Sequence, residues 1–270
     1  MTRRLVTATA AATMTVAIGA ELRRRAPGGR DRWTRQNFRD RAVDLFAGPA
    51  AAAGAVTAAA LAAPPRGGGR LAGAVAAAAG LGLYDDLAGV THARGLRGHF
   101  RALAHGEVTT GIVKLAGLAA AGLVAAPCRT GRCSVAQRLA DGALISGAAN
   151  LVNLLDLRPG RALKTVAFVG LPLAVSGTGP GAAAAAGALA STAALLPGDL
   201  DERHMIGDCG ANALGALVGW ALAERLGICG RLAALSAVIG LTLASERISF
   251  SAVIDNQLLL RSVDRWGRQP

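Results

Sequence analysis

The chain has 270 residues, of which 52% are apolar, 17% are charged and only 3% are aromatic. Soluble domains carry about 25% charged residues, and a soluble core with so few aromatic side chains would consist almost entirely of Ala, Leu and Val. The net charge of +12 does not indicate nucleic-acid binding, because the basic residues lie in short loops between apolar runs. Composition therefore argues against soluble and nucleic-acid-binding proteins and favours an integral membrane protein.

Nine apolar runs are candidates for membrane-spanning helices, which need about 20 residues with a range of roughly 17–25. They predict an all-α integral membrane protein, a polytopic bundle of about nine to ten transmembrane helices in one domain (1–270) with a cytoplasmic tail (246–270). The first run is expected to be a retained helix and not a cleaved signal peptide, since a basic loop and eight further runs follow it. Several runs are short or rich in Gly and Pro, so one or two could be broken or merged. The runs lie near residues 5–22, 42–63, 69–84, 107–126, 138–155, 163–178, 181–197, 210–226 and 230–245.

The basic residues are distributed unevenly between the two sides of such a bundle. The odd-numbered loops and the C-terminal tail hold 19 Lys and Arg residues, and the other side, with the N-terminus, holds 9. By the positive-inside rule, this split predicts a plasma-membrane protein whose N-terminus is outside and whose C-terminus is cytoplasmic. Of the 17 acidic residues, only Asp141 and Glu224 fall on the external side, which suggests that the chemistry lies on the cytoplasmic face.

The first polar cluster is the pair Asp85-Asp86, which follows Tyr84 at the end of the third run. Two adjacent carboxylates at a membrane boundary repel each other, and burial of either one without a partner is costly. A divalent cation or basic partners would offset that cost. A solvated helix end explains the pair equally well, so both interpretations stay open for this cluster alone.

The second polar cluster consists of Asn150, Asn153 and Asp156 at the end of the fifth run. A spacing of three residues places them along one face of a helix, and polar groups at membrane depth usually line the bundle interior or a watery cavity. Hydrogen bonding between helices is the alternative. The Pro159-Gly160 pair should then end the helix and let basic side chains project into the cytoplasm. These basic residues are Arg158, Arg161 and Lys164.

The third polar cluster is Asp208, flanked by Gly207 and Gly210 at the start of the eighth run. Glycine lets the backbone approach a ligand closely, and a helix N-terminus offers unpaired N–H groups that suit phosphate. An Asp at this position is also a common N-cap, and in isolation the N-cap interpretation would be favoured.

Together the clusters offer carboxylates for a hard cation and basic groups for phosphate, a combination that suits Mg²⁺. Lys114, inside the fourth run, is added to the substrate-binding candidates. No His or Cys spacing indicates zinc, and there is no phosphate-binding P-loop motif. Cys128 and Cys133 enclose a short loop on the predicted external side, where a disulfide and two free thiols are both open.

Three ordered motifs, LYDDLAG, NLVNLLDLRPG and MIGDCGANALG, resemble those of the polyprenyl-phosphate N-acetylhexosamine-1-phosphate transferases. This superfamily includes the phospho-N-acetylmuramoyl-pentapeptide transferase and the UDP-N-acetylglucosamine:polyprenyl-phosphate enzymes. The resemblance covers roughly residues 40–260. Each motif alone is weakly specific, whereas the three together on one predicted side are fairly specific.

The resemblance implies an Mg²⁺-dependent enzyme that transfers a phospho-N-acetylhexosamine-type sugar from a UDP-sugar to polyprenyl phosphate and releases UMP, for cell-wall or surface glycan synthesis. It implies that Asp208 is the main Mg²⁺ ligand, with Asp86 as a second ligand and Asp85 near the lipid phosphate. A homodimer is compatible with it. The nucleotide-diphosphate site would be lined by Asn150, Asn153 and Asp156, with Gly207 and Gly210 beside the phosphates.

Three departures from the family pattern qualify this expectation. The family's second motif usually continues Asp-Gly-Leu-Asp-Gly, whereas this chain has Leu157, Arg158, Pro159 and Gly160 after Asp156, so the later acid is lost. The His-rich motif of the muramoyl-pentapeptide enzymes is absent, and nine spans are counted instead of ten. These departures argue against the muramoyl-pentapeptide substrate and leave open a divergent member, or an inactive one that acts as a membrane scaffold or transporter.

A second enzyme class, the CDP-alcohol phosphotransferases, is also helical and Asp-dependent, but it needs further acids one and two turns after the first pair. Residues 91–95, Thr-His-Ala-Arg-Gly, supply none. Under the metal assignment, Asp208→Asn is expected to lower UMP release by orders of magnitude, while Asp199 and Asp201, in the same loop but outside the motif, should tolerate the same change. If Asp208 only caps the helix, Asp208→Asn should instead keep nearly full activity, and any loss should be one of stability.

Overall fold

The computed structural model describes residues 1–88, 95–127 and 134–269, so Cys128 and Cys133, for which a disulfide and two free thiols are both left open, lie outside the described residues. Within these ranges the chain forms nine helices of 15 residues or more, each at the position of one predicted apolar run. The prediction of an all-α fold is confirmed. The long helices are α1 (Thr2–Arg25), α2 (Ala47–Ala62), α3 (Pro65–Ala88), α5 (Thr110–Ala125), α6 (Val135–Leu155), α7 (Arg161–Val175), α8 (Pro180–Leu200), α9 (Gly207–Arg225) and α10 (Ile228–Ser245).

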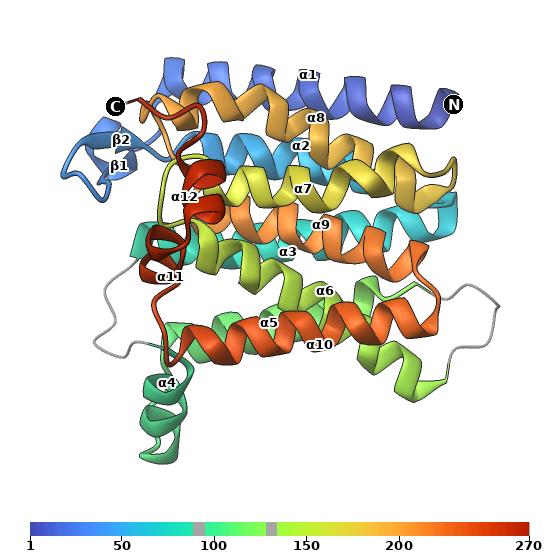
Figure 1. Ribbon diagram of the computed structural model, residues 1–270. Coiled ribbons are helices and arrows are strands. Elements are labelled where there is room, and N and C mark those ends of the chain that lie inside the picture. Colours follow the sequence, from blue (N-terminus) through green and yellow to red (C-terminus); the bar gives the residue numbers. More distant parts are fainter. Residues whose placement is uncertain (89–94, 128–133, 270) are drawn as a thin grey trace.

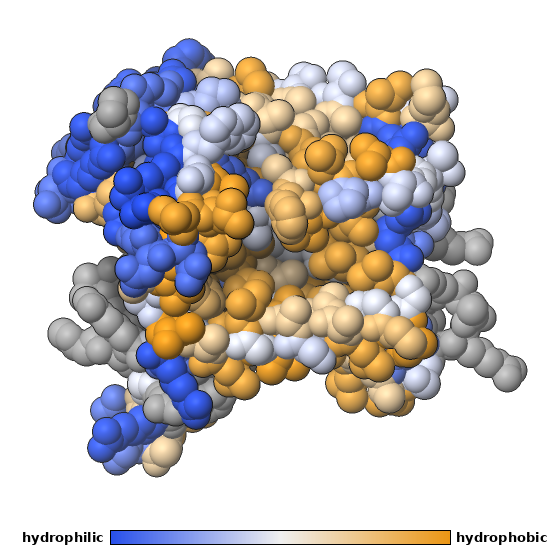
Figure 2. Space-filling view, in the orientation of Figure 1, coloured by the Kyte–Doolittle hydropathy of each residue, from blue (hydrophilic) through white to orange (hydrophobic). Residues whose placement is uncertain are grey.

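Four of the described helices are long and apolar enough to cross a membrane. They are α1, residues Gly67–Ala88 of α3, α8 and α10, while α2 and α5 are apolar but shorter. The number of nine to ten membrane-spanning helices therefore stays a prediction. Figure 2 shows apolar side chains over the middle of the visible face, with most of the hydrophilic side chains at one end and fewer at the other.

Helix α9 forms the centre of the bundle and packs against α2, α3, α6, α7 and α8 (Figure 1). Fifteen of its nineteen residues are buried. Small residues allow this close packing: a Cβ at Gly215 would lie 2.7 Å from the Ala148 carbonyl oxygen, and one at Gly219 would lie 2.8 Å from the Ala148 Cβ. Contacts between Gly and Ala residues thus hold α9 against α6, because small residues let two helix backbones approach closely.

The predicted second span begins later than expected, because residues 42–44 do not belong to it. The basic loop after α1 folds into a 3-10 turn, η1 (Arg30–Trp33), and a hairpin of strands β1 (Thr34–Gln36) and β2 (Ala42–Asp44). Trp33 stacks against Phe46 with ring centroids 5.1 Å apart, and both rings are buried together with Leu45. Hydrogen bonds from the Asp44 N–H to the Arg203 carbonyl and from the Met205 N–H to the Asp44 carbonyl attach the hairpin to the α8–α9 loop.

The predicted C-terminal tail is folded. It contains α11 (Phe250–Asn256) and α12 (Leu258–Arg265), which lie across the end of the bundle that also carries the hairpin and α4 (Gly95–Ala104) (Figure 1). Arg161 of α7 is buried and makes a bidentate ion pair with Asp264, at 2.8 and 3.1 Å. Lys164 donates to the carbonyl oxygens of Asp264 (2.8 Å) and Trp266 (2.6 Å).

The prediction that Arg161 and Lys164 project into the cytoplasm is therefore wrong. Both side chains hold the C-terminal segment on α7, since one neutralises a buried carboxylate and the other supplies donors to carbonyls near the end of α12. Sequence spacing could not show this, because the partner lies 103 residues away.

We expect Asp264→Ala to release this segment, because it leaves Arg161 buried without its partner, a loss of about 3–5 kcal/mol for a broken buried pair. Amide hydrogen exchange of residues 250–269 should rise sharply, while Asp255→Ala in α11 leaves it unchanged. Although burial would raise the pKa of Asp264, hydrogen bonding and charge from Arg161, with the charge of Arg268, hold that pKa below its usual value. The stabilisation is therefore complete above about pH 4 and is lost as the pH falls further. Unchanged exchange in Asp264→Ala would contradict the role of the pair.

Candidate functional site

The three polar motifs meet at one end of the bundle, where α3 and α6 end and α9 begins. A helix end positions each motif. Asp85 and Asp86 lie in the last turn of α3, and Asp156 follows directly after the last residue of α6. Asp208 is the second residue of α9, which starts at Gly207. Gly160, with a φ of 73° that favours glycine, completes the turn between α6 and α7. The predicted break at Pro159-Gly160 is confirmed.

The Lys114 ammonium group of α5 connects the first and third motifs. It forms ion pairs with Asp208 and with Asp85, the latter at 3.2 Å. Asn153 joins them: with its amide oriented by its hydrogen bonds, Nδ2 donates to Asp208 Oδ1 (2.7 Å) and Oδ1 accepts from Lys114 Nζ (3.0 Å). Lys114 is buried, so oxygen atoms from three helices converge on one buried cation.

Asp86 has a different role from its neighbour. Its two carboxylate oxygens accept hydrogen bonds from the backbone N–H groups of Asp208 (3.0 Å) and Cys209 (2.9 Å), and so cap the N-terminus of α9 from another helix. Gly207 has a φ of 56°, and a Cβ there would lie 2.9 Å from the Asp86 oxygens. The N-cap alternative for Asp208 is therefore wrong, because Asp86 provides the acceptor oxygens.

Asp156 lies beside this helix start as a buried carboxyl group. Burial raises its pKa well above the usual value, and the charges of Asp199 and Asp208 raise it further, while a hydrogen bond from the Gly207 N–H acts in the opposite direction. Its Oδ2 atom has no hydrogen-bond partner in the part of the chain that the structure describes. Such an orphaned oxygen is costly unless a ligand or solvent meets it.

A small cavity of about 190 Å³ opens next to Asp156, between the hairpin and the α6–α7 turn. Arg158 lies on its wall with the guanidinium carbon 4.2 Å from the centre of the Phe38 ring, and Arg35 of β1 donates to the Asp86 carbonyl oxygen. Among the basic residues predicted after Asp156, Arg158 is thus the one that lines a cavity at the site, stacked on an aromatic ring.

A second hollow, an apolar groove of about 300 Å³, lies between α5, α6 and α10. Asn150 lines it together with Leu115, which follows Lys114 on α5. Asn150 therefore lies one helical turn from Asn153 and faces an apolar groove, so the predicted polar stripe divides between the groove and the ion-pair network.

Two further expectations need correction. Asp199, expected to tolerate substitution, is buried and accepts a 2.5 Å hydrogen bond from the Gly160 N–H, whereas Asp201 is exposed. Gly210, expected beside phosphate, instead faces α2: a Cβ there would lie 3.2 Å from the Gly48 Cα. Asp199→Asn is therefore unsuitable as a neutral control.

The donor set at this site suits a hard divalent cation, judged by its chemistry. Asp85, Asp208 and Asn153 are oxygen ligands, the kind Mg²⁺ prefers, and they already converge on a positively charged group, Lys114. Within the described ranges, no group of three or more His, Cys, Asp and Glu residues could hold a metal ion. Mg²⁺ commonly needs only one or two carboxylates together with phosphate oxygens, so the fit requires a phosphate-bearing substrate.

Comparison with known proteins assigns no family: no family model matches the chain, and no curated protein matches it. The motifs and their geometry thus carry the functional argument. Sequence reasoning missed Arg35, Phe38 and Asp199. The sequence did contain one indication of a folded loop. Two aromatic residues, Trp33 and Phe38, lie within the arginine-rich loop, and large aromatic side chains favour a packed loop over a solvated one.

We expect Asp86→Ala to destabilise the protein by about 1–3 kcal/mol, because two buried N–H groups at the start of α9 lose their acceptors. The stability of Asp86→Asn should lie between that of Asp86→Ala and that of the wild type, since the Asn amide retains one oxygen that accepts a hydrogen bond. Thermal unfolding in detergent measures the effect, with exposed Asp201→Ala as the control. A wild-type melting curve for Asp86→Ala would show that the cap contributes nothing.

Proposed function

We propose that the chain is an Mg²⁺-dependent transferase that moves a phospho-N-acetylhexosamine-type sugar from a UDP-sugar to polyprenyl phosphate, with release of UMP. The observation that carries this proposal is the convergence of Asp85, Asp208 and Asn153 on Lys114 at a capped helix start. The order of the three motifs along the chain, which resembles that of the polyprenyl-phosphate sugar-phosphate transferases, supports it.

The reaction requires one bond to form and one to break. An oxygen of the lipid phosphate attacks the sugar-linked phosphorus of the UDP-sugar, and the bond between that phosphorus and the bridging oxygen of UMP breaks, so UMP leaves with the electron pair. A phosphate monoester has a second pKa near 6 and is largely dianionic at neutral pH. No general base is required, and the protein's task is positioning and neutralisation of charge.

Named residues of this chain suit those tasks. In this proposal Lys114 binds phosphate oxygens, and Asn153 orients Asp208 by the 2.7 Å hydrogen bond. Mg²⁺, held by Asp208 and Asp85 in this proposal, supplies neutralisation of the diphosphate charge. Asp86 is better assigned to positioning Asp208, because both of its oxygens already accept backbone hydrogen bonds.

We assign one substrate to each of the two hollows described above, the apolar groove and the 190 Å³ cavity. The apolar groove between α5, α6 and α10 is lined by Leu115, the residue after Lys114, and by Asn150, one turn before Asn153. In this proposal the groove takes the polyprenyl chain, with the lipid phosphate directed toward the Lys114 network. The 190 Å³ cavity beside Arg158 is smaller than a typical ligand site of about 300–1,000 Å³. We assign it to one part of the nucleotide.

We further propose that the bundle lies in the plasma membrane with this end in the cytoplasm. The four membrane-length helices support insertion, and the excess of Lys and Arg on the side of the hairpin and the C-terminal segment supports the orientation. A UDP-sugar is a cytoplasmic metabolite class, so the site and the positive side would coincide.

One observation favours a non-catalytic member of the same fold. Lys114 already neutralises Asp85 and Asp208, so the network is satisfied without a metal and would serve equally as a buried structural contact. Such a protein would act as a membrane scaffold or transporter. The two functions make opposite predictions for Asp208.

We expect Asp208→Asn to lower UMP release by orders of magnitude, because the amide cannot hold a hard cation on the diphosphate. The assay incubates membranes carrying the protein with polyprenyl phosphate, Mg²⁺ and a panel of UDP-sugars. Asp201→Asn is the matched control, since it is exposed and lies in the loop before α9. Wild-type turnover in a well-folded Asp208→Asn protein would rule out the metal role, and no UMP with any sugar would favour the scaffold.

Orientation is testable with the exposed thiol of Cys229, because Cys209 is buried and unsuitable for labelling. In a background without Cys128 and Cys133, an impermeant maleimide should label Cys229 at the start of α10 in intact cells. In a second variant that also lacks Cys229, a cysteine at exposed Arg32 in the 3-10 turn η1 should react only after permeabilisation. The opposite pattern would invert the topology.

A further inference from the structure

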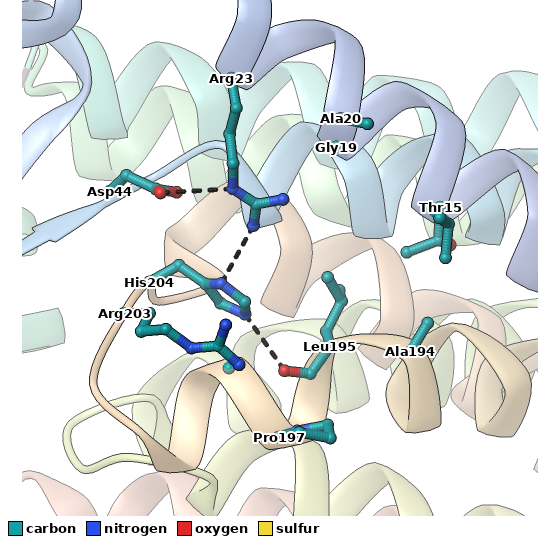
Figure 3. A pocket seen from close by; sticks show the side chains of 12 residues that line it. Thr15, Gly19, Ala20, Arg23, Asp44, Ala194, Leu195, Pro197, Arg203 and His204 are labelled. Carbon is teal, nitrogen blue, oxygen red and sulfur yellow. Dashed lines mark hydrogen bonds and ion pairs between the residues drawn. The ribbon is translucent and has the colours of Figure 1, made fainter.

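A groove of about 500 Å³ lies along the contact between α1 and α8, near the hairpin, and Figure 3 shows side chains that line it. These two helices lie on the side of the bundle away from α5 and α10 (Figure 1). Its walls are apolar along most of their length, with Val16 and Ala20 from α1 and Ala194 and Pro197 from α8. Both helices are long and apolar enough to cross a membrane. The groove therefore follows two candidate membrane helices toward the end that carries the hairpin.

Charged groups line that end of the groove. Arg23 forms an ion pair with Asp44 at 3.5 Å and donates to His204 Nδ1 at 3.1 Å (Figure 3). Arg203 also lines the groove, and its side chain is 67% exposed while it pairs with Asp201. Two guanidinium groups thus face a groove whose remaining lining is mostly apolar.

His204 adds no charge to this end. Arg23 can only donate and the Leu195 carbonyl can only accept, so the hydrogen bonds at Nδ1 and Nε2 (3.1 Å each) fix the neutral ring with the proton on Nε2. Burial, the largest effect, also lowers the pKa of His204. Among the residues that line the groove, Asp44 is the acid, and its Oδ1 also accepts from the Phe46 N–H at 3.0 Å. With Arg23 and Arg203 it gives the lining a net charge of +1, while Asp201, which pairs with Arg203, lies outside the lining.

We infer that this groove binds one anionic phospholipid, with its phosphate between Arg23 and Arg203 and one acyl chain between α1 and α8. Charge complementarity selects an anionic headgroup, and the apolar walls select a lipid over a soluble phosphate. Basic side chains at the end of a membrane helix are suited to this contact. The inference rests on the membrane location alone, so an absence of UMP release would not affect it.

The bound headgroup would also stabilise the loop that leads into the candidate site. Arg23 holds His204 and Asp44, and Asp44 is hydrogen-bonded through its backbone to Arg203 and Met205. Gly207 and Asp208 follow directly. The groove is separate from the apolar groove beside Lys114, which lies between α5, α6 and α10.

Native mass spectrometry of delipidated protein in detergent tests the inference, with titration by phosphatidylglycerol, by phosphatidylcholine of the same acyl chains, and by inorganic phosphate. Arg23→Gln/Arg203→Gln should weaken the first phosphatidylglycerol by about 30-fold, since each cationic contact contributes about 1 kcal/mol. The matched control is Arg24→Gln/Arg25→Gln, which removes the same charge from the same helix end, where both residues pair with Glu21.

A second variant tests the apolar wall without changing charge. Ala194 is exposed on α8, and Ala194→Trp should block the acyl chain and weaken the first phosphatidylglycerol to a similar degree, even if the double Arg variant fails to fold. Equal binding by the wild type, Ala194→Trp and any folded double Arg variant would overturn the inference. So would equal affinity for phosphatidylcholine, or displacement of the lipid by millimolar inorganic phosphate, which would indicate a simple anion site.

Discussion

The buried start of α9 sets the main constraint on the polar end of this protein. A helix leaves its first N–H groups without intrahelical partners, and α9 begins deep among other helices, where water cannot easily satisfy them. The Asp86 carboxylate of α3 supplies both acceptors. Close approach makes this possible, since a Cβ at Gly82 would overlap the Asp208 carbonyl oxygen. The position of Asp208 therefore depends on the contact between α3 and α9.

Because other helix ends meet the buried start of α9, several carboxyl groups lie close together there. Asp85, Asp86, Asp156 and Asp208 all lie near the start of α9, and Lys114 and the helix N-terminus offset part of their charge. Burial is the largest cause of the raised pKa of Asp156, and that raised pKa favours the uncharged form of the carboxyl group. A diphosphate would still be repelled by the remaining carboxylates. Binding of a nucleotide here thus calls for a divalent cation, which links the proposed metal to the proposed substrate.

The sequence predicted the helices and the meeting of the motifs because both follow from local patterns. Apolar runs define helices, and polar residues at alternate helix ends must share one end of an antiparallel bundle. The division of roles between Asp85 and Asp86 was not predictable, because it depends on the rotation of α3 against α9. Nor was the pairing of Arg161 with Asp264, since a long-range ion pair leaves no periodic signal. The hairpin was missed because its two three-residue strands are too short to show alternation.

Basic residues of the hairpin, which contribute to the topology prediction, also make structural contacts. Asn37 donates to Glu202 at 2.5 Å, and Arg39 and Arg41 form ion pairs with the same carboxylate at 3.2 and 3.7 Å. Glu202 has a φ of 55°, which is unusual for a side-chain-bearing residue and needs such support. The α8–α9 loop is therefore held from the hairpin side immediately before Gly207. Basic residues whose excess predicts the cytoplasmic side would thus also fix the loop that presents Asp208, so that orientation and site geometry depend on the same arginines.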